Sequence, residues 1–597
     1  MRTLGASGSA SLFSILHRTA SILPTFLPTG ETSPKMLIPA LLIAASVVIA
    51  AHLYTRLRHK RFEQFAGFPQ LPPSLIWGHM LAFDEFTKRG KQDRHPDLVF
   101  ADMHKAIGSP PLMLADMRPV QIPVVIVSSH DIAEQVSKSS NLFPWSLPKT
   151  PSIVDNVHLI GSSSIISAEG EKWRDLRKRF APGFAPGYLM GLLPCILDNV
   201  EIFINHLDDL ARSQQEFSLT EAFANLTIDI ISSVVMQENV HAQSTEEASD
   251  LVRDFRALLA TYSGKHNVPR ILVPGLDSKR RGLSNKVDSL LEDIVIRKFK
   301  QYQNNLLGNE TRSILSLSFQ DIDTLTPDLI EHTSHQVKSF LFAGHGTTSI
   351  LLSWTFYELS RTPSILKSLC TELDEVFGPD TEPRHVISTL RSGGKDFINH
   401  LPYTSAVIKE ILRLHPPAGT GRYSPPGTGF KVRTQTGQEY CLDGTIVYIC
   451  HTIIHRDPAI YGDTVNDFIP ERWLGDAETS DAGEGLNLPS WTSDGESTRK
   501  FPPGAWRPFE RGPRNCIGQE LANIEARVIV ATVARSFSFV KAGLGEMELG
   551  SDGLPLLNSA GQYNVKSELY PTLQVTIKPV DGMRMRVKHA AYSQGVL

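Results

Sequence analysis

The sequence predicts a large, mainly α-helical domain with small β-sheets, preceded by a single membrane-spanning helix. Helical periodicity dominates from about residue 80 to about residue 415. Short β-rich pieces, punctuated by Pro and Gly, follow between about residues 416 and 475. Near the N-terminus, residues 36–54 run without a charge. These observations divide the chain into an extension (1–35), an anchor (36–54), a basic flank with a proline-rich hinge (55–82) and the large domain (83–597).

Residues 36–54 are long enough to cross a bilayer. At about 1.5 Å per residue, a helix of this length spans about 28 Å, close to the thickness of the hydrocarbon core. The alternative is a buried core helix, which the charges and the proline-rich segment that follow disfavour. By the positive-inside rule, the basic residues after the run place the large domain in the cytosol, and they are Arg56, Arg58, Lys60 and Arg61.

The segments on either side of the anchor add detail to this topology. Residues 68–73, Phe-Pro-Gln-Leu-Pro-Pro, predict a stiff, polyproline-like hinge that holds the domain at a fixed angle to the membrane. Residues 1–35 are Ser-rich and contain no acid before Glu31, a pattern typical of an organellar transit peptide. Met36 is an alternative start. We nevertheless expect a single-pass anchor in the endoplasmic reticulum membrane.

Composition excludes several classes of protein. With 59 Lys and Arg against 63 Asp and Glu, the net charge of -4 gives no sign of a nucleic-acid binder. The 5 cysteines form no C-x-x-C pair and are odd in number, so neither a zinc site nor a disulfide framework is indicated. We therefore expect a reducing compartment for the large domain. Residues 475–500, rich in Asp, Glu, Ser and Gly, predict a solvated surface loop.

The most informative segment is residues 509–518, which form an F-x-x-G-x-R-x-C-x-G string around Cys516. A thiolate that ligates haem iron needs nearby positive charge and a backbone that turns tightly around the sulfur. Gly512 and Gly518 allow that turn. Arg514 is positioned to offer its planar fork to a haem propionate, and Phe509 to lie under the macrocycle and exclude water. The alternative is a buried free cysteine in a Gly-rich loop.

This string resembles the haem-binding loop of the cytochrome P450 superfamily. The resemblance covers roughly residues 65–590 and is closest to membrane-anchored, microsomal-type, fungal-like haem-thiolate monooxygenases. It implies haem b, iron protoporphyrin IX, as the cofactor and Cys516 as its metal ligand. It also implies the cytochrome P450 fold, a large helical domain with small β-sheets at one side, and the proline-rich hinge is similar to those of microsomal members.

A long helix is expected from about Pro327 to Arg361, with Thr326 as its cap. Small residues at Ala343 and Gly344 would let it pass close over a flat macrocycle, with a local widening for dioxygen. The resemblance implies that Thr347 is the catalytic residue that passes a proton to the reacting oxygen. An Ala/Gly/Thr packing face between helices is the alternative for this segment.

One position departs from the family pattern. Members usually carry Asp or Glu immediately before the threonine, whereas this chain has Gly346. We expect an ordered water beside Thr347 to replace the acid, because glycine leaves space for it. His345 projects about 100° away from its neighbour and is less suited to that role.

Two further motifs predict a structural ion-pair network. Glu410 and Arg413 form an E-x-x-R string whose spacing puts both on one helix face, an arrangement that alone is also common on surfaces. Residues 468–473, Phe-Ile-Pro-Glu-Arg-Trp, resemble the family's P-E-R-F/W motif and add Arg472. Two arginines around one buried carboxylate would lock the segment that carries the cysteine loop.

Further residues are expected to hold the haem propionates. Trp173 and Arg177 are four apart, so they share a helix face, although an exposed cation–π pair is the alternative. The resemblance implies the same role for Arg422, which follows a turn through residues 415–417. A basic surface for an acidic flavoprotein reductase is expected from the neighbouring residues Lys172, Arg174, Lys178 and Arg179.

The resemblance implies a monooxygenase that inserts one oxygen atom of O2 into a lipophilic small molecule. Electrons would come from a separate NADPH–cytochrome P450 reductase, since the chain has no flavin or dinucleotide fingerprint. Gly346 and the N-terminal extension favour specialised metabolism. The alternatives are a haem-thiolate isomerase or dehydratase that needs no reductase, and a non-catalytic haem-binding protein. The pocket is expected to be lined by residues 141–166, with Phe143, Trp145 and Leu147, and by residues 215–275.

Overall fold

The computed structural model describes residues 34–244, 246–262, 273–304, 313–474, 501–573 and 576–590. Residues 1–33 of the expected extension, and the loop expected over residues 475–500, lie outside these ranges. The chain divides into two compact units, Met1–Ala66 and Gly67–Leu597.

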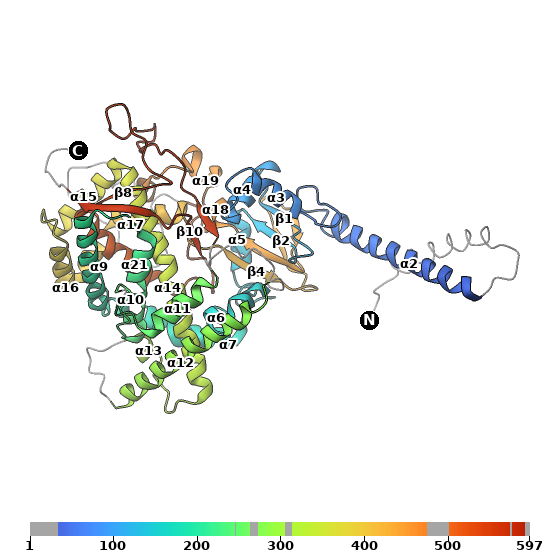
Figure 1. The fold of residues 1–597 in the computed structure, drawn as a ribbon, viewed down its shortest axis with the longest axis horizontal. Coiled ribbons are helices and arrows are strands. Elements are labelled where there is room, and N and C mark those ends of the chain that lie inside the picture. Colours follow the sequence, from blue (N-terminus) through green and yellow to red (C-terminus); the bar gives the residue numbers. More distant parts are fainter. Residues whose placement is uncertain are drawn as a thin grey trace. The chain divides into compact units, whose positions relative to one another are not determined.

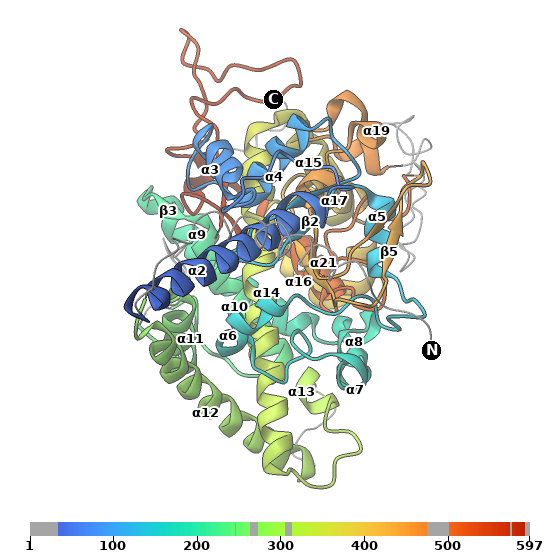
Figure 2. The same ribbon diagram turned by 90° about the vertical axis from the view of Figure 1, so that its right-hand side faces the viewer.

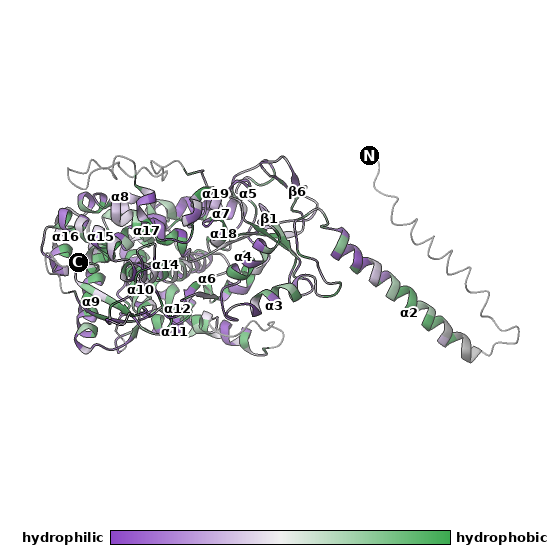
Figure 3. Ribbon diagram, turned by 90° about the horizontal axis from the view of Figure 1, so that it is seen from above, coloured by the Kyte–Doolittle hydropathy of each residue, from purple (hydrophilic) through white to green (hydrophobic). Residues whose placement is uncertain are grey.

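The first unit contains a long apolar helix, α2 (Pro34–Arg58), continued by a short π-helix, η2 (His59–Glu63). The segment Leu41–Glu63 is long and apolar enough to cross a membrane, and its most apolar stretch is not buried, although Arg61 near its end is. Figure 3 shows its apolar stretch in green. The helix extends beyond the uncharged run because Arg and Lys are themselves good helix formers. A second apolar helix, α10 (Leu219–Met236), is mostly buried and therefore belongs to the core.

The second unit is mainly helical, as predicted (Figure 1). Its longer helices are α3 (Met80–Lys88), α4 (Pro96–Ala106), α5 (His130–Ser137), α7 (Gly170–Phe180), α9 (Leu193–Ser213), α10, α11 (Asp250–Ala260), α12 (Leu276–Gln303), α14 (Pro327–Arg361), α15 (Pro363–Phe377), α16 (Pro383–Asn399), α17 (Pro402–Leu414) and α21 (Gln519–Val533). The short helices include α6 (Val157–Ile160), α8 (Pro186–Met190), α13 (Ile314–Leu317), α18 (His451–Ile454) and α19 (Pro458–Tyr461).

The β-structure is small but more widely distributed than the sequence predicted. The four-stranded sheet has the order β1-β2-β7-β4, in which β2 and β7 are parallel and the other pairs antiparallel. A three-stranded sheet has the order β3-β11-β8, and β5–β6 and β9–β10 are hairpin pairs. Figure 1 shows the four-stranded sheet and β8 at opposite ends of the unit, so the sheets do not all lie at one side. The strands are β1 (Leu112–Ala115), β2 (Val124–Val127), β3 (Phe217–Ser218), β4 (Thr420–Ser424), β5 (Lys431–Arg433), β6 (Glu439–Cys441), β7 (Thr445–Ile449), β8 (Phe537–Lys541), β9 (Pro571–Leu573), β10 (Ile577–Pro579) and β11 (Arg584–His589).

Helix α14 forms the centre of the core (Figure 2). It begins and ends at the predicted residues, and the Thr326 side chain caps it by accepting a hydrogen bond from the Leu329 amide at 3.3 Å. Helix α10 packs along it. A Cβ added at Gly344 would lie 3.0 Å from Ile231 of α10, so the glycine permits this close approach. The small residue thus serves helix packing here, and the expected passage of α14 over a macrocycle stays a prediction.

The structure brings Glu410, Arg413 and Arg472 together in the core. Arg413 Nη2 donates to Glu410 Oε1 at 2.7 Å, and Arg472 Nε donates to the same oxygen at 2.8 Å. Trp473 Nε1 donates to Glu410 Oε2 at 2.9 Å. Glu410 and Arg413 are fully buried. A buried carboxylate is stable only with such partners, because it has given up its water.

The same arginines hold the irregular chain between α18 and the short 3-10 helix η7 (Pro470–Trp473). Arg413 donates to three backbone carbonyls, those of His455, Val465 and Asp467, at 2.6–3.0 Å. Arg472 Nη2 donates to the Thr464 carbonyl at 3.2 Å. Parts of this segment, among them α19, have backbone hydrogen bonds of their own, and the two guanidinium groups bond further carbonyls, which helps to fix its path.

We expect deletion of residues 1–61 to release the protein from the membrane fraction. The deletion removes most of the exposed apolar segment, while the second unit keeps its own core. Sedimentation after a carbonate wash measures the release, and circular dichroism checks that the second unit stays folded. Deletion of residues 1–33 alone is the control and should leave the protein in the membrane. Full retention of the longer deletion would contradict α2 as the main anchor.

We expect Glu410→Gln to destabilise the second unit by about 3–5 kcal/mol, because two guanidinium groups would lose their buried counter-charge. Thermal unfolding of the detergent-solubilised protein measures this change. Glu439→Gln is the matched control, because Glu439 pairs with Lys431 at 3.3 Å on the exposed surface. Its effect should stay within about 0.5 kcal/mol. Equal stability of the two variants would show that Glu410 does not lock this region.

Candidate functional site

The cysteine loop, residues 507–518, is shaped by two left-handed backbone positions. Glu510 has a φ of 58° and Gly512 a φ of 77°. A Cβ added at Gly512 would lie 2.2 Å from the Ser137 carbonyl oxygen, so only glycine fits there. The loop then turns back, and the Cys516 amide donates to the Phe509 carbonyl at 2.8 Å. The loop is therefore packed tightly on the end of α5.

Arg507 anchors the loop and was not assigned a role from the sequence. Its side chain is buried, pairs with Glu510 and donates to Ser137 Oγ at 2.7 Å. Its amide donates to His455 Nε2 at 3.0 Å. Burial opposes ionisation of Glu510, yet His451 and Arg507 hold the pKa of that carboxyl well below its ordinary value. The loop is thus fixed by a buried ion pair.

The Cys516 side chain borders open space, since the residue is exposed. Enough protein nevertheless surrounds it for burial to raise the pKa of the thiol. The Gly518 amide and the positive charges of Arg177 and Lys149 act in the opposite direction and favour the thiolate. Arg177 donates through Nη1 and Nη2 to the carbonyl and side-chain oxygens of Asn515, both at 2.8 Å. In this structure it therefore supports the cysteine loop directly, and its expected contact with a propionate stays a prediction.

Three cationic side chains gather beside this space. Lys149 and Arg422 are paired across an isolated β-bridge, although they are far apart in the sequence. Burial, and then the charges of Arg422 and Arg514, lower the pKa of Lys149 to about 7. Among the described residues, Nε and Nη1 of Arg422 and Nε of Arg514 are buried without a hydrogen-bond partner. Such a cluster favours the binding of anions.

Trp173 and Arg514 lie together in this cluster. The Arg514 guanidinium stands 4.6 Å from the centre of the Trp173 ring. Its Nη1 donates to the Ala168 carbonyl at 2.9 Å, and its Nη2 pairs with Glu169. Glu169 also accepts from the Lys149 amide at 2.7 Å. Arg514 is thus held by protein groups on one edge of its guanidinium.

These residues fit haem. Its two propionates are carboxylates, which match the orphaned guanidinium nitrogens of Arg422 and Arg514 and the amine of Lys149. The thiol of Cys516 matches the ligand that such a group requires. Lys149 is an addition to the residues expected from the sequence.

Helix α14 presents Ala343 and Thr347 on one face, one turn apart. Both are only half-buried, whereas His345, Gly346 and Thr348 are buried. The Thr347 hydroxyl donates to the Ala343 carbonyl at 2.8 Å. The helix runs continuously through this turn, so the expected local widening is not present.

Gly346 points toward Thr576, which precedes β10. A Cβ added at Gly346 would lie 3.6–3.7 Å from the Thr576 side chain, which is ordinary van der Waals contact. His345 faces a different neighbour. Its Nδ1 lies 2.8 Å from the Leu341 carbonyl, its ring packs edge-on against Phe255, and burial lowers its pKa to about 4. His345 is therefore neutral and unable to replace the missing acid.

The expected basic surface is smaller than predicted. Lys172 and Lys178 are exposed, but Arg174 pairs with Glu171 and Asp175. Arg179 turns inward, where it donates to the Ser318 carbonyl at 3.0 Å and to Thr333 Oγ1 at 3.1 Å. Burial lowers the pKa of Arg179 to about 10. Residues two apart on a helix project about 200° apart, which separates Arg179 from Arg177.

The residues expected to line a substrate pocket are only partly placed by the structure. Trp145 packs against Trp173 with ring centres 5.8 Å apart, and Phe143 packs against Phe430 at 5.6 Å. Leu147 is buried. Residues 245 and 263–272 of the second expected segment lie outside the described ranges. The role of these segments stays a prediction.

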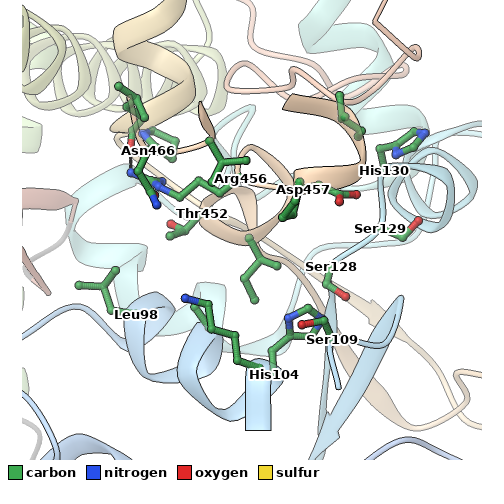
Figure 4. Close-up of a pocket in the computed structure, with 18 of the residues that line it drawn as sticks. Leu98, His104, Ser109, Ser128, Ser129, His130, Thr452, Arg456, Asp457 and Asn466 are labelled. Carbon is green, nitrogen blue, oxygen red and sulfur yellow. Dashed lines mark hydrogen bonds between the residues drawn. The ribbon is translucent and has the colours of Figure 1, made fainter. Parts of the chain in front are cut away.

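A separate cavity of about 1540 Å³ lies elsewhere in the second unit. Figure 4 shows Leu98 and His104 of α4 on one side and Thr452, Arg456 and Asp457 on the other. Its lining does not include Cys516, Ala343 or Thr347. We do not assign this cavity to the reaction.

Comparisons with known proteins agree with this geometry. The family model for cytochrome P450 matches residues 69–565. Cytochrome P450 monooxygenase acrF of Aspergillus aculeatus is 30% identical over 509 residues, which are 84% of this chain and 98% of that protein. Cytochrome P450 monooxygenase polC of Polytolypa hystricis is 28% identical over 515 residues, 84% of this chain and 86% of that protein.

A solved structure, the haem domain of cytochrome P450DA, has the same fold, with a TM-score of 0.63 at 19% identity. The match covers 88% of this chain and 98% of that one. The family model, the fungal relatives and the cysteine loop lead to one conclusion: this chain belongs to the cytochrome P450 family and is a cytochrome P450 monooxygenase, an oxidoreductase.

Proposed function

We propose that this enzyme inserts one oxygen atom of O2 into a lipophilic small molecule of specialised metabolism. The observation that carries the proposal is the arrangement of the Cys516 thiol beside the cation cluster of Lys149, Arg422 and Arg514. The two fungal relatives described above are monooxygenases by name. Gly346 departs from the family pattern, and this departure supports a substrate of specialised metabolism over one of a housekeeping reaction.

Haem b, when bound, supplies the iron chemistry that activates dioxygen. Cys516 would ligate its iron, and the Gly518 amide with the charges of Arg177 and Lys149 would favour the deprotonated sulfur against the burial that raises the pKa of the thiol. The propionates would be held by Arg422, Arg514 and Lys149, with Trp173 supporting Arg514. Phe509, half-buried in the loop, would shield the sulfur from water.

On the other side of the site, Ala343 would leave room for small reactants, and Thr347 would hold and pass a proton. In the structure the Thr347 hydroxyl is engaged with the Ala343 carbonyl, which keeps it oriented along this face of α14. The two residues lie one turn apart and are half-buried. A group that touches a reactant must be accessible in this way.

The partner would be NADPH–cytochrome P450 reductase, and the site of action the endoplasmic reticulum membrane, with a single pass and the second unit in the cytosol. The apolar helix α2 and its basic end support this placement. Lys172 and Lys178 remain as exposed positive charges for an acidic partner.

Gly346 keeps a second candidate open, an isomerase or dehydratase that needs no reductase. A non-catalytic haem-binding protein is the third. NADPH consumption with a supplied reductase separates the monooxygenase from both.

We expect the reduced protein with carbon monoxide to show the red-shifted Soret band of a thiolate-ligated haem. Cys516→Ala should abolish that band, because no other thiol of the described residues belongs to the cysteine loop. Absorption spectroscopy of the reduced protein measures it. Cys441→Ala is the control, since Cys441 is an exposed thiol on β6. Survival of the band in Cys516→Ala would refute the assigned ligand.

We expect Gly346→Asp to lower the hydrogen peroxide released per NADPH, because the new acid would supply protons beside Thr347. The neighbouring Thr576 leaves room for the added Cβ. Peroxide and NADPH are measured in air with reductase and no organic substrate. Gly346→Asn, of the same shape but without an acid, should not lower the ratio. A higher ratio in the Asp variant would overturn the idea that this position limits proton supply.

A further inference from the structure

The cavity shown in Figure 4 is separate from the site described above. Its volume is about 1540 Å³, and its lining includes no residue of the cysteine loop and none of Lys149, Arg422 and Arg514. Residues of α4, of the end of α14 and of the chain that follows α18 form its walls. Apolar side chains such as Leu98, Trp354 and Ile453 alternate there with a few charged groups. Such a mixture is typical of a site for a small molecule.

Three arginines line this cavity, and two of them have a carboxylate partner. Arg94 pairs with Asp102 at 2.8 Å, and Arg361 lies 3.9 Å from Glu358. Arg456 has no ion pair with any residue that the structure describes. Its Nη2 donates to the Leu414 carbonyl at 2.6 Å, whereas its Nη1 is buried without a hydrogen-bond partner. The residue as a whole is half-buried, so part of it is accessible from the cavity.

Arg456 shares this condition with Arg422. Of the described arginines that have a buried, unbonded nitrogen, these two alone lack a carboxylate partner. Arg422 belongs to the cluster that fits the haem propionates, and Arg456 lies outside it. Burial, followed by the charge of Arg413, lowers the pKa of Arg456 to about 10, so the side chain is still a cation at pH 7. A cation that has lost its water without gaining a counter-charge favours the binding of an anion.

The other charges of the lining leave Arg456 unmatched. Asp131 lies 3.2 Å from His130 Nε2, and Asp457 caps α19 by accepting from the Ala459 amide at 2.9 Å. The exposed charges of the lining, which water screens, are Lys105 and Glu568. One buried positive charge therefore stays without a partner. It matches a singly charged carboxylate better than a phosphate group, which carries up to two charges at pH 7.

We propose that this cavity is a second binding site, which takes a small organic molecule with an apolar body and one carboxylate, and that Arg456 is its anchor. The carboxylate accepts from the Arg456 guanidinium and supplies the missing counter-charge. The apolar side chains of the lining cover the body of the ligand. The proposal does not rest on the monooxygenase function, because none of the residues assigned to that reaction lines the cavity.

Substitutions on two walls of the cavity test the proposal. Arg456→Gln removes the charge, and Arg456→Lys keeps a positive charge without the planar fork. Leu98→Trp fills the cavity from α4 and leaves Arg456 intact, so it keeps the test valid where Arg456→Gln fails to fold. Arg391→Gln is the matched control. Arg391 is an exposed arginine of α16 that pairs with Asp198 at 2.6 Å and does not line the cavity.

The probe is cinnamate, a planar apolar molecule with one carboxylate, and the measurement is isothermal titration calorimetry of the haem-loaded full chain in detergent. We expect Arg456→Gln to weaken cinnamate binding about tenfold, because a hydrogen bond between charged groups is lost. Leu98→Trp should weaken it as well, Arg456→Lys should retain part of the affinity, and Arg391→Gln should change nothing. Cinnamamide, of similar shape but uncharged, should bind the wild type about tenfold more weakly than cinnamate. The Soret band should not shift on binding, because Cys516 does not line the cavity.

Several outcomes would overturn the proposal. They are the absence of cinnamate binding to the wild type, equal affinity of the wild type and Arg456→Gln, and unchanged affinity in Leu98→Trp. Binding that shifts the Soret band and is insensitive to Arg456→Gln would place the ligand at the haem instead. Tighter binding of cinnamyl phosphate than of cinnamate would overturn the assignment of a carboxylate ligand.

Discussion

The site depends on a continuous buried polar chain that begins at Glu410 and ends at the cysteine loop. Glu410 fixes Arg413, whose Nη1 donates to the His455 carbonyl at 3.0 Å. Burial, with the charges of His451 and Arg413, holds the pKa of His455 well below its ordinary value, so its ring is neutral. Its Nε2 is then free to accept from the Arg507 amide at 3.0 Å. Arg507 in turn pairs with Glu510, so a displacement at Glu410 would be transmitted to the backbone that carries Cys516.

This chain also explains how the protein tolerates so much buried charge. Around Glu410 and Glu510 each carboxylate has guanidinium partners within the protein, so those sites are balanced without any ligand. Around Lys149, Arg422 and Arg514 the balance is incomplete: Glu169 pairs with Arg514, and buried guanidinium nitrogens of Arg422 and Arg514 lack hydrogen-bond partners. Buried unpaired cations are costly. The excess of positive charge is therefore a property of the binding site. It suits a ligand that carries two carboxylates.

The sequence predicted the parts of this architecture that local signals determine. Thr326 and Pro327 fixed the start of α14, because a cap followed by proline is a local signal. Strands β1 and β2 were missed, since each is only four residues long and buried on both faces, so neither alternates in hydrophobicity. Lys149 was missed because strand pairing far along the chain, not its own neighbours, brings it to Arg422. The inward turn of Arg179 was missed because its partners, Ser318 and Thr333, lie far along the chain.

Helix α14 shows why glycine at position 346, where the family usually has an acid, need not end proton supply to Thr347. Four residues of this turn meet four different surroundings: Gly344 meets α10, His345 meets Phe255 of α11, Gly346 meets Thr576 and Thr348 meets α21. Thr347, between the last two, is half-buried, as is Ala343 one turn before it. Glycine at position 346 therefore alters the surroundings of Thr347 on one flank of the helix and leaves the other flank unchanged.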